Sequence, residues 1–311
     1  MEENKNEELI SSDKEQDNFS NKLIASIIIA CFILSIALVI IGIIVYLSKD
    51  KSLSELEVYK KYEKQEQIKL GGDRIVYKAK NRETNETVAI KQIKLKTKEI
   101  RNEVENDIKF MNASNHLSNK TFQLKEVFEQ RSTKFIVTEY YDEDLSITLS
   151  KTEKGFEIEK VKSLVKTMNR ILQGLRGFNV VYNNIKLENI IVQKNGDKND
   201  TIKLADYSKA KLITNDKNDT KENEYGITPV FGDINEEKED LYNIGKEIYR
   251  MLFKETGKKN QEMIKGIKEK YNNPELNGLM EKLLVDDKKV KISWDDYFNH
   301  TFFAEKISKN N

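Results

Sequence analysis

The pattern of apolar and polar positions sets one uncharged run apart from the rest of the chain. Residues 23–47 read LIASIIIACFILSIALVIIGIIVYL and contain no charged side chain. As an α-helix this run would be roughly 37 Å long at about 1.5 Å per residue, enough for a hydrocarbon core of about 30 Å. A core helix of a soluble domain would show a polar face, and this run has none. The pattern predicts a membrane-spanning helix over residues 23–47.

The flanking segments bear on the competing interpretation, a cleaved signal peptide. Residues 1–22 form a long acidic leader, and no small-x-small cleavage pattern follows the apolar run, which favours an anchor. The polar composition of the leader predicts disorder. Residues 48–61 are interpreted as a charged linker. Lysines are enriched after the run, which predicts a single-pass membrane protein whose residues 48–311 lie in the cytosol.

Beyond residue 61 the pattern changes to alternating apolar and polar residues with turn residues between the segments. It predicts an antiparallel meander followed by a helix and two further strands. The predicted strands are 65–70, 74–80, 86–93, 121–128 and 133–138, and the helix is 97–112.

The second half of the chain has mainly helical periodicity. Residues 158–178 carry a wide apolar stripe that runs from Val161 to Phe178, as expected for a helix buried on one side. The other predicted elements are two short strands at 189–193 and 201–204 and helices at 236–253, 275–285 and 293–299. A small β-rich part followed by a larger helical part predicts an α+β fold with two lobes and a ligand-binding cleft between them.

Composition excludes several classes of function. Charged residues make up 34% of the chain and the formal net charge is +1, so we expect no nucleic-acid partner. The single cysteine, Cys31, lies inside the apolar run, where a reactive thiolate is disfavoured. The two histidines, His116 and His300, are too few and too far apart for a metal cluster.

Several segments of the chain occur in the order and at the separations found in protein kinases. They are LGGDRIVYKA (70–79), VAIK (88–91), YNNIKLEN (182–189), LADYSKA (204–210) and DLYNIG (240–245). The chain resembles a eukaryotic-type protein kinase over residues 62–305, and residues 306–311 are interpreted as a tail. The resemblance implies a bilobal fold that binds ATP and Mg²⁺.

The resemblance also assigns roles to individual residues. The nucleotide-binding positions are Gly71, Val76, Ala89, Lys91, Thr138 and Ile191. Lys91 would hold the α- and β-phosphates, whereas Asn189 and Asp206 match the metal ligands. Lys91 needs an acidic partner on the following helix, for which Glu103 and Asp107 compete. We favour Asp107 from its distance to Asn115-His116, although its shorter side chain predicts an ion pair that does not close fully.

The chain departs from the family at positions that carry catalysis. Asn184 replaces the aspartate that accepts the substrate proton, although Lys186 beside it is kept. The third glycine of the phosphate loop is Arg74, and the first is Lys69. Tyr207 and Ser208, after Asp206, replace the usual Phe and Gly, and Asn183 replaces the arginine that would bind a phosphorylated activation loop.

The substrate-docking loop is also altered. In YGITPVFG, residues 225–232, at most the triplet Thr228 to Val230 remains of the family pattern, and the usual glutamate is absent. Its customary arginine partner is Lys291. The sequence therefore predicts a membrane-anchored pseudokinase that binds ATP and acts on a cytosolic protein as an allosteric partner or scaffold.

Two alternatives remain open. One is a weakly active Ser/Thr kinase, because phosphoryl transfer depends mainly on positioning and charge neutralisation. The other is a scaffold that binds no nucleotide because Arg74 or Lys69 fills the site.

Overall fold

The computed structural model describes residues 32, 34–43, 56–115, 122–195, 198–233, 238–285 and 290–304. The chain divides into two compact units, residues 1–61 and residues 62–311. In the first unit, residues 34–43 are helical and a second helix, α2, spans Glu57–Lys61. Part of the predicted linker is thus helical.

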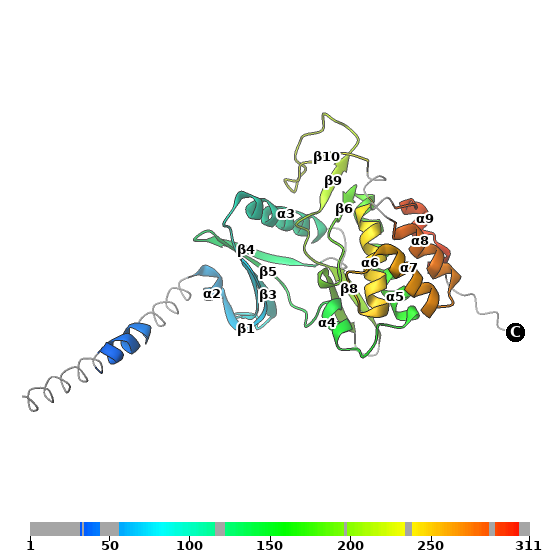
Figure 1. Cartoon of the computed structure of the whole chain (residues 1–311). Coiled ribbons are helices and arrows are strands. Elements are labelled where there is room, and N and C mark those ends of the chain that lie inside the picture. The colour runs from blue at the N-terminus through cyan, green and yellow to red at the C-terminus, as the bar shows by residue number, and fades with distance from the viewer. Residues whose placement is uncertain are drawn as a thin grey trace, which may run out of the picture. The chain divides into compact units, whose positions relative to one another are not determined.

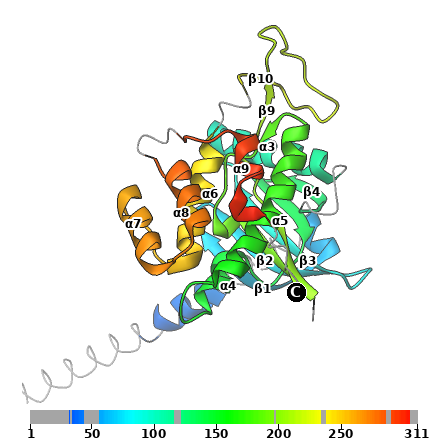
Figure 2. The ribbon, with the colours of Figure 1, turned by 90° about the vertical axis from the view of Figure 1, so that its right-hand side faces the viewer.

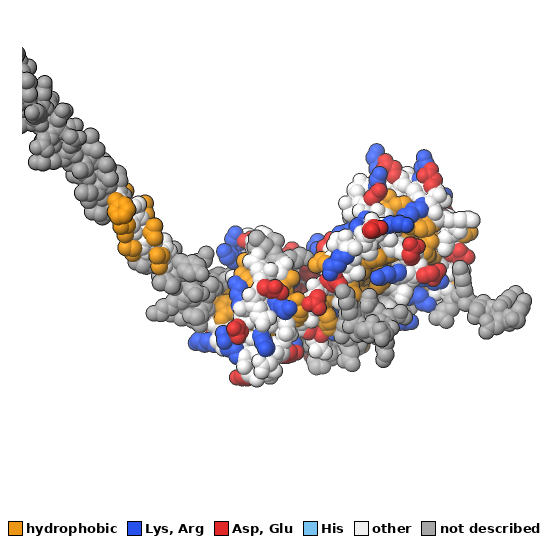
Figure 3. All heavy atoms as spheres, turned by 90° about the horizontal axis from the view of Figure 1, so that it is seen from below, with side chains coloured by type: hydrophobic (Ala, Val, Ile, Leu, Met, Phe, Trp, Pro, Cys, Tyr) orange, Lys and Arg blue, Asp and Glu red, His pale blue; other side chains and the backbone are white. Residues whose placement is uncertain are grey.

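Most of the predicted membrane-spanning run, residues 23–47, lies outside the described residues. Its described part is helical and its large apolar side chains are exposed, with Phe32 at 67% and Leu34 at 65%. Figure 3 shows apolar side chains on the outside of this helical part. Within the described ranges, no helix combines the length and apolarity needed to cross a bilayer.

The second unit begins with a five-stranded sheet in the order β1-β2-β3-β5-β4, in which each neighbouring pair is antiparallel. The strands are β1 Tyr62–Gly71, β2 Arg74–Asn81, β3 Thr87–Lys94, β4 Leu124–Gln130 and β5 Thr133–Glu139. The β1-β2-β3 pairing confirms the predicted meander. Gly72, in the β1–β2 turn, has a φ of +52°, a conformation that glycine adopts without steric cost.

Helix α3, Lys98–Asn115, connects β3 to β4 and lies beside the sheet (Figure 1). The hydroxyl of Thr97 accepts the backbone N–H of Ile100 at 3.3 Å, which satisfies one free donor of the first turn. Val104 and Met111, at helical spacing, are 2% exposed and join the core. Because these apolar residues face the core, they fix the rotation of α3 about its axis and so determine which of its side chains face other parts of the molecule.

The larger part of the second unit is helical. Its helices are α4 Leu145–Ser150, α5 Ile158–Gly177, α6 Glu239–Phe253, α7 Asn260–Lys270, α8 Pro274–Leu283 and α9 Trp294–Phe298. Figure 2 shows α8 between α6 and α7, in agreement with the contacts between these helices. The stripe of α5 is buried from Val161 to Leu175, but Phe178 follows the helix and is 55% exposed, which corrects its predicted place on the stripe.

Two small sheets belong to this helical part. One pairs β7, Ile190–Asn195, with β8, Lys198–Leu204, in antiparallel fashion. The other has the order β10-β9-β6, with β6 at Val180–Val181, β9 at Lys211–Thr214 and β10 at Val230–Phe231. Residues 182–189 therefore join β6 to β7, and residues 205–210 join β8 to β9. Both connections carry predicted site residues.

Candidate functional site

Four of the predicted nucleotide-binding residues share one face of the five-stranded sheet. Val76 on β2 lies opposite Lys91 on β3, and Ala89 on β3 lies opposite Thr138 on β5. Because side chains alternate across a strand, Ala89 and Lys91 point to the same side. The other side of β3 carries Val88 and Ile90, both fully buried. The sheet thus places the lysine beside small and apolar residues, as an adenine nucleotide would require.

The remaining two predicted nucleotide-binding residues come from different elements. Gly71 ends β1 and lies opposite Arg74 across the turn. Ile191 lies on β7 in the helical part, where it forms an isolated bridge with Asp144.

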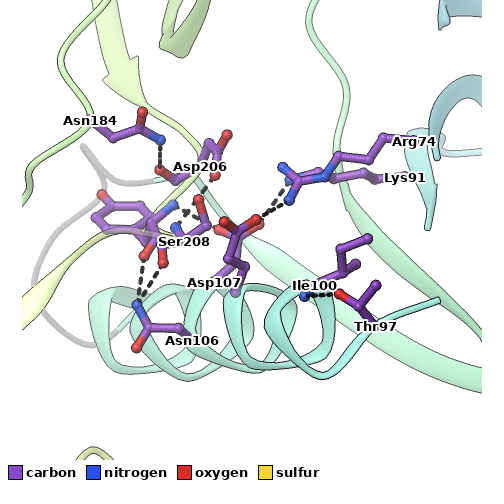
Figure 4. A network of polar contacts seen from close by, with 11 residues as sticks. Arg74, Lys91, Thr97, Ile100, Asn106, Asp107, Asn184, Asp206 and Ser208 are labelled. Carbon is purple, nitrogen blue, oxygen red and sulfur yellow. Dashed lines mark hydrogen bonds and ion pairs between the residues drawn. The ribbon is translucent and has the colours of Figure 1, made fainter. Parts of the chain in front are cut away.

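Lys91 forms an ion pair with Asp107 on α3. The Lys91 Nζ lies 2.8 Å from Asp107 Oδ2, and the aspartate side chain is only 2% exposed. The expectation of an incompletely closed pair is therefore wrong, because α3 packs close enough to the sheet for the shorter side chain. Glu103, the competing residue, pairs with Arg74 at 2.6 Å instead. Figure 4 shows Arg74 and Lys91 side by side, both reaching toward α3.

Charge balance keeps Lys91 protonated. Burial alone would lower the pKa of the Lys91 ammonium, but the carboxylates of Asp107 and Asp206 outweigh this and raise it. An ammonium held in this way carries a full positive charge at neutral pH and is available to a phosphate.

Asp206 follows β8 and has a φ of +64°, in the left-handed region. Burial would raise the pKa of its carboxyl group, but Lys91, the hydrogen bond from Ser208, Arg74 and Lys186 together lower it to about 2. The carboxylate is therefore ionised at neutral pH. Ionised carboxylate oxygen is the ligand type that Mg²⁺ prefers.

Asn184 and Asn189 are connected to each other and to Asp206. The Asn184 side-chain Nδ2 donates to the backbone carbonyl of Asp206 at 2.9 Å, and the Asn189 Nδ2 donates to the backbone carbonyl of Asn184 at 2.9 Å. Both side chains are buried, at 8% and 6% exposure. With its nitrogen bonded in this way, Asn189 retains its amide oxygen as an acceptor, which suits a hard cation.

The donor set formed by Asp206 and Asn189 therefore fits Mg²⁺. Across the described ranges, no group of three or more His, Cys, Asp and Glu side chains could hold a metal ion by itself. Mg²⁺ commonly binds through one or two protein oxygens together with nucleotide phosphates and water. A metal here would thus arrive with the nucleotide.

Asp240, the buried first-turn aspartate of α6, supports the segment that contains Asn184. Its Oδ2 accepts the backbone N–H groups of Tyr182 and Asn183 at 3.1 and 2.9 Å. Asn183 has a φ of +57°, so the two bonds hold a backbone conformation that few residues adopt readily. The Tyr182 ring packs edge-to-face on Tyr207, with centroids 5.3 Å apart.

Asn106 is a site residue that the sequence did not single out. It precedes Asp107 on α3, and its Nδ2 donates to the backbone carbonyls of Tyr207, Ser208 and Ala210 at 3.0 to 3.2 Å. Asp107 adds a bond from its Oδ1 to the Tyr207 backbone N–H at 2.7 Å. The adjacency of Asn106 to Asp107 is a sequence signal, but its partners are about 100 residues away and no local pattern reveals them.

The altered docking loop is held differently. Lys109 on α3 donates to the Gly226 carbonyl and lies 3.6 Å from Glu222. Asn223 accepts the backbone N–H groups of Tyr225 and Ile227, each at 3.0 Å, in a local turn. Thr228 and Lys291 are exposed. The segment thus rests on α3 and on its own turn.

The sequence matches the family model described as "Protein kinase domain" over residues 62–303. The chain belongs to the protein kinase family. Curated relatives include "CTD kinase subunit alpha" of Schizosaccharomyces pombe, 31% identical over 158 residues, and "Cyclin-dependent kinase-like 5" of Mus musculus and of Homo sapiens, each 27% identical over 146 residues.

These similarities cover only part of each protein. The match to the S. pombe relative covers 50% of this chain and 26% of that protein. The match to the mouse and human relatives covers 46% of this chain and 15% of theirs. The kinase fold with its β-sheet lobe and helical part agrees with the family, and the relatives include cyclin-dependent-kinase-like proteins.

Proposed function

We propose that the chain is a membrane-anchored pseudokinase, which binds ATP and acts as an allosteric partner or scaffold for a cytosolic protein. The observation that carries this proposal is Asn184 at the position of the catalytic base. A neutral amide does not accept the proton of a substrate hydroxyl, and its nitrogen already donates to the Asp206 carbonyl. General bases contribute roughly 10²–10⁴-fold to rate, so phosphate transfer by this chain is severely impaired.

The nucleotide side of the site supports ATP binding. Lys91 would hold the α- and β-phosphates, and Asp206 with Asn189 would hold Mg²⁺. Bound Mg²⁺ would neutralise charge on the phosphate oxygens. Val76, Ala89, Thr138 and Ile191 would enclose the base, and Gly71 would allow the backbone to approach the phosphates.

The membrane anchor and the partner are the less direct parts of the proposal. The anchor is residues 23–47, supported by their length and lack of charge. The lysines that follow the run favour a cytosolic kinase domain. A protein partner is favoured over nucleic acid because the net charge of +1 offers no basic surface in excess.

The intact ion pair favours a second candidate, a weakly active Ser/Thr kinase. Lys91 and Asp107 lie 2.8 Å apart, and such a pair is a requirement for activity in this family. The similar proteins named above are also described as kinases. In this alternative Asn184 orients the substrate hydroxyl and Lys186 assists beside it.

A thermal melt of the full chain in detergent tests nucleotide binding. ATP with Mg²⁺ at 100 times its dissociation constant would add about 2.7 kcal/mol to the free energy of unfolding. For a domain of this size the melting temperature would rise by several degrees, at roughly 2–4 °C per kcal/mol. Lys91→Met should remove the rise. No rise for wild-type protein that melts cooperatively would discard the nucleotide part of the proposal and the kinase alternative with it.

A further inference from the structure

Arg74 brings a second side-chain cation to the phosphate side of the site. It opens β2 directly after the β1–β2 turn, where the family resemblance expects glycine. Arg74 and Val76 are two residues apart on β2 and share a face, and Val76 lies opposite Lys91. Arg74 and Lys91 therefore project from the same face, and Figure 4 shows their charged groups together above α3.

The position of Arg74 is set by Glu103. The guanidinium Nη2 lies 2.6 Å from Glu103 Oε2, and the two side chains are 33% and 45% exposed. An ion pair this accessible to water is weak. The positive charge of Arg74 also acts to lower the pKa values of Lys91 and Asp206, in keeping with its place beside them.

The other charges of the site favour a further cation beside the phosphates. Asp107 offsets part of the charge of Lys91, and Asp206 adds a negative charge that repels phosphate. In other members of the family Mg²⁺ offsets that repulsion. A guanidinium offers planar, bidentate donors that match phosphate oxygens and is always charged. A triphosphate entering beside Lys91 is a stronger partner for Arg74 than the solvated Glu103.

We propose that Arg74 is a second phosphate-binding residue, which exchanges Glu103 for the nucleotide's phosphates and allows ATP to bind without Mg²⁺. The inference rests on the proposed nucleotide-binding function and deepens it. Arg74 stands where the family has a glycine. Its positive charge would bind the phosphates, whereas the glycine would let the backbone approach them. The exchange also connects nucleotide occupancy to α3, which carries Glu103.

Calorimetric titration of ATP into the full chain, in detergent with either EDTA or Mg²⁺, tests the inference. We expect wild-type protein to bind ATP in both solutions. Arg74→Gln should raise the dissociation constant about tenfold or more in EDTA, the scale of one hydrogen bond to a charged group, and by less in Mg²⁺. Arg74→Lys, which keeps the charge but loses the fork, should recover part of the affinity.

Arg82→Gln is the matched control. Arg82 follows the far end of β2 and pairs with Glu63 at 3.8 Å, with side chains 50% and 61% exposed. Its removal should leave both dissociation constants unchanged. Equal affinities of wild type and Arg74→Gln, or binding by wild type only with Mg²⁺, would overturn the role of Arg74 and leave the proposed function standing. Wild-type protein that binds no ATP in either solution would refute both.

Discussion

The residues that would hold nucleotide and those that would handle substrate are fixed by different kinds of contact. On the nucleotide side, Asp107 is buried and binds both Lys91 and the backbone of Tyr207. On the substrate side, Thr228 and Lys291 are exposed, and Asn184 offers a neutral amide. Asp107 connects α3 to the segment after Asp206, whereas Thr228 and Lys291 are exposed and Asn184 adds one bond to the Asp206 carbonyl. A change confined to the substrate side would therefore leave most of the contacts of the nucleotide side in place.

Helix α3 shows how the two sides remain connected. Asn106 and Asp107 bind residues 207–210, and Lys109 binds the Gly226 carbonyl and approaches Glu222. The segment that follows Asp206 is thus held from α3 by unmodified side chains. This arrangement needs no phosphorylated residue, in keeping with Asn183 at the position of the phosphate-binding arginine.

The largest expected effect comes from restoring the base. Asn184→Asp introduces a proton acceptor of the same size, so we expect phosphate transfer from ATP to generic protein substrates to rise roughly 10²–10⁴-fold. The variant also loses the donor to the Asp206 carbonyl, which should cost about 1 kcal/mol of stability. A radiolabelled-phosphate assay and a urea titration measure the two effects.

The double variant with Lys91→Met is the control for this gain. It should show no transfer, which excludes a contaminating kinase. If Asn184→Asp binds ATP but transfers phosphate no faster than wild type, the prediction is wrong. The altered docking segment, and not the missing base alone, would then limit transfer.

A smaller effect, on stability, comes from breaking the nucleotide side. Asp107→Ala leaves Lys91 and the Tyr207 backbone N–H without their partner. Removing one member of a buried pair costs about 3–5 kcal/mol, and because Lys91 is 23% exposed we expect the lower end, about 3 kcal/mol. Urea unfolding followed by circular dichroism measures the free energy of unfolding.

Glu103→Ala is the matched control on the same helix. Its carboxylate is 45% exposed and pairs only with the accessible Arg74 among the contacts that the structure describes for it, so the expected loss is below about 1 kcal/mol. Equal decreases in the free energy of unfolding for Asp107→Ala and Glu103→Ala would contradict the prediction. Burial would then not explain how the nucleotide side is stabilised.

Much of the fold was predictable because it follows from local periodicity. The alternation of the first three strands and the apolar spacing of Val104 and Met111 on α3 depend on neighbours in sequence. The short helices α4 and α7 were missed. Helix α4 spans only six residues, Leu145–Ser150, too few to establish a period, and α7 buries a narrow set of apolar residues.

The site residues that occupy family positions could be predicted from the sequence. The contacts between residues far apart in the sequence could not. Lys91 and Asp206 stand at family positions, and the family distance rather than the residue type favoured Asp107 over Glu103. The triple hydrogen bond of Asn106 joins positions about 100 residues apart, and the pairing of Arg74 with Glu103 crosses from sheet to helix. The first contact joins the two lobes and the second joins a strand to a helix of the same lobe, so both depend on the folded arrangement and not on local sequence.

The smallest expected effect is a pH dependence that arises from Asp206. Its pKa is about 2 in the folded protein and about 3.9 in an unfolded chain. A carboxyl group with a lowered folded pKa stabilises the protein fully above its unfolded pKa, and this stabilisation is lost as the pH falls toward 2. Asp206→Asn lacks this contribution, so wild type should exceed the variant by about 1–2 kcal/mol at pH 6 and by much less at pH 2.5.

Urea titrations of both proteins at the two pH values give the comparison. Asp216→Asn, which removes an exposed carboxylate just after β9, controls for the loss of one acidic residue. A gap between wild type and Asp206→Asn that stays constant down to pH 2.5 would contradict the prediction, because protonation of Asp206 in the unfolded chain below about pH 3.9 should already have removed much of the stabilisation. A stability difference that becomes smaller as the pH falls would show that the negative charge of Asp206 stabilises the nucleotide side of the site. The same charge is the feature that suits Asp206 to a metal.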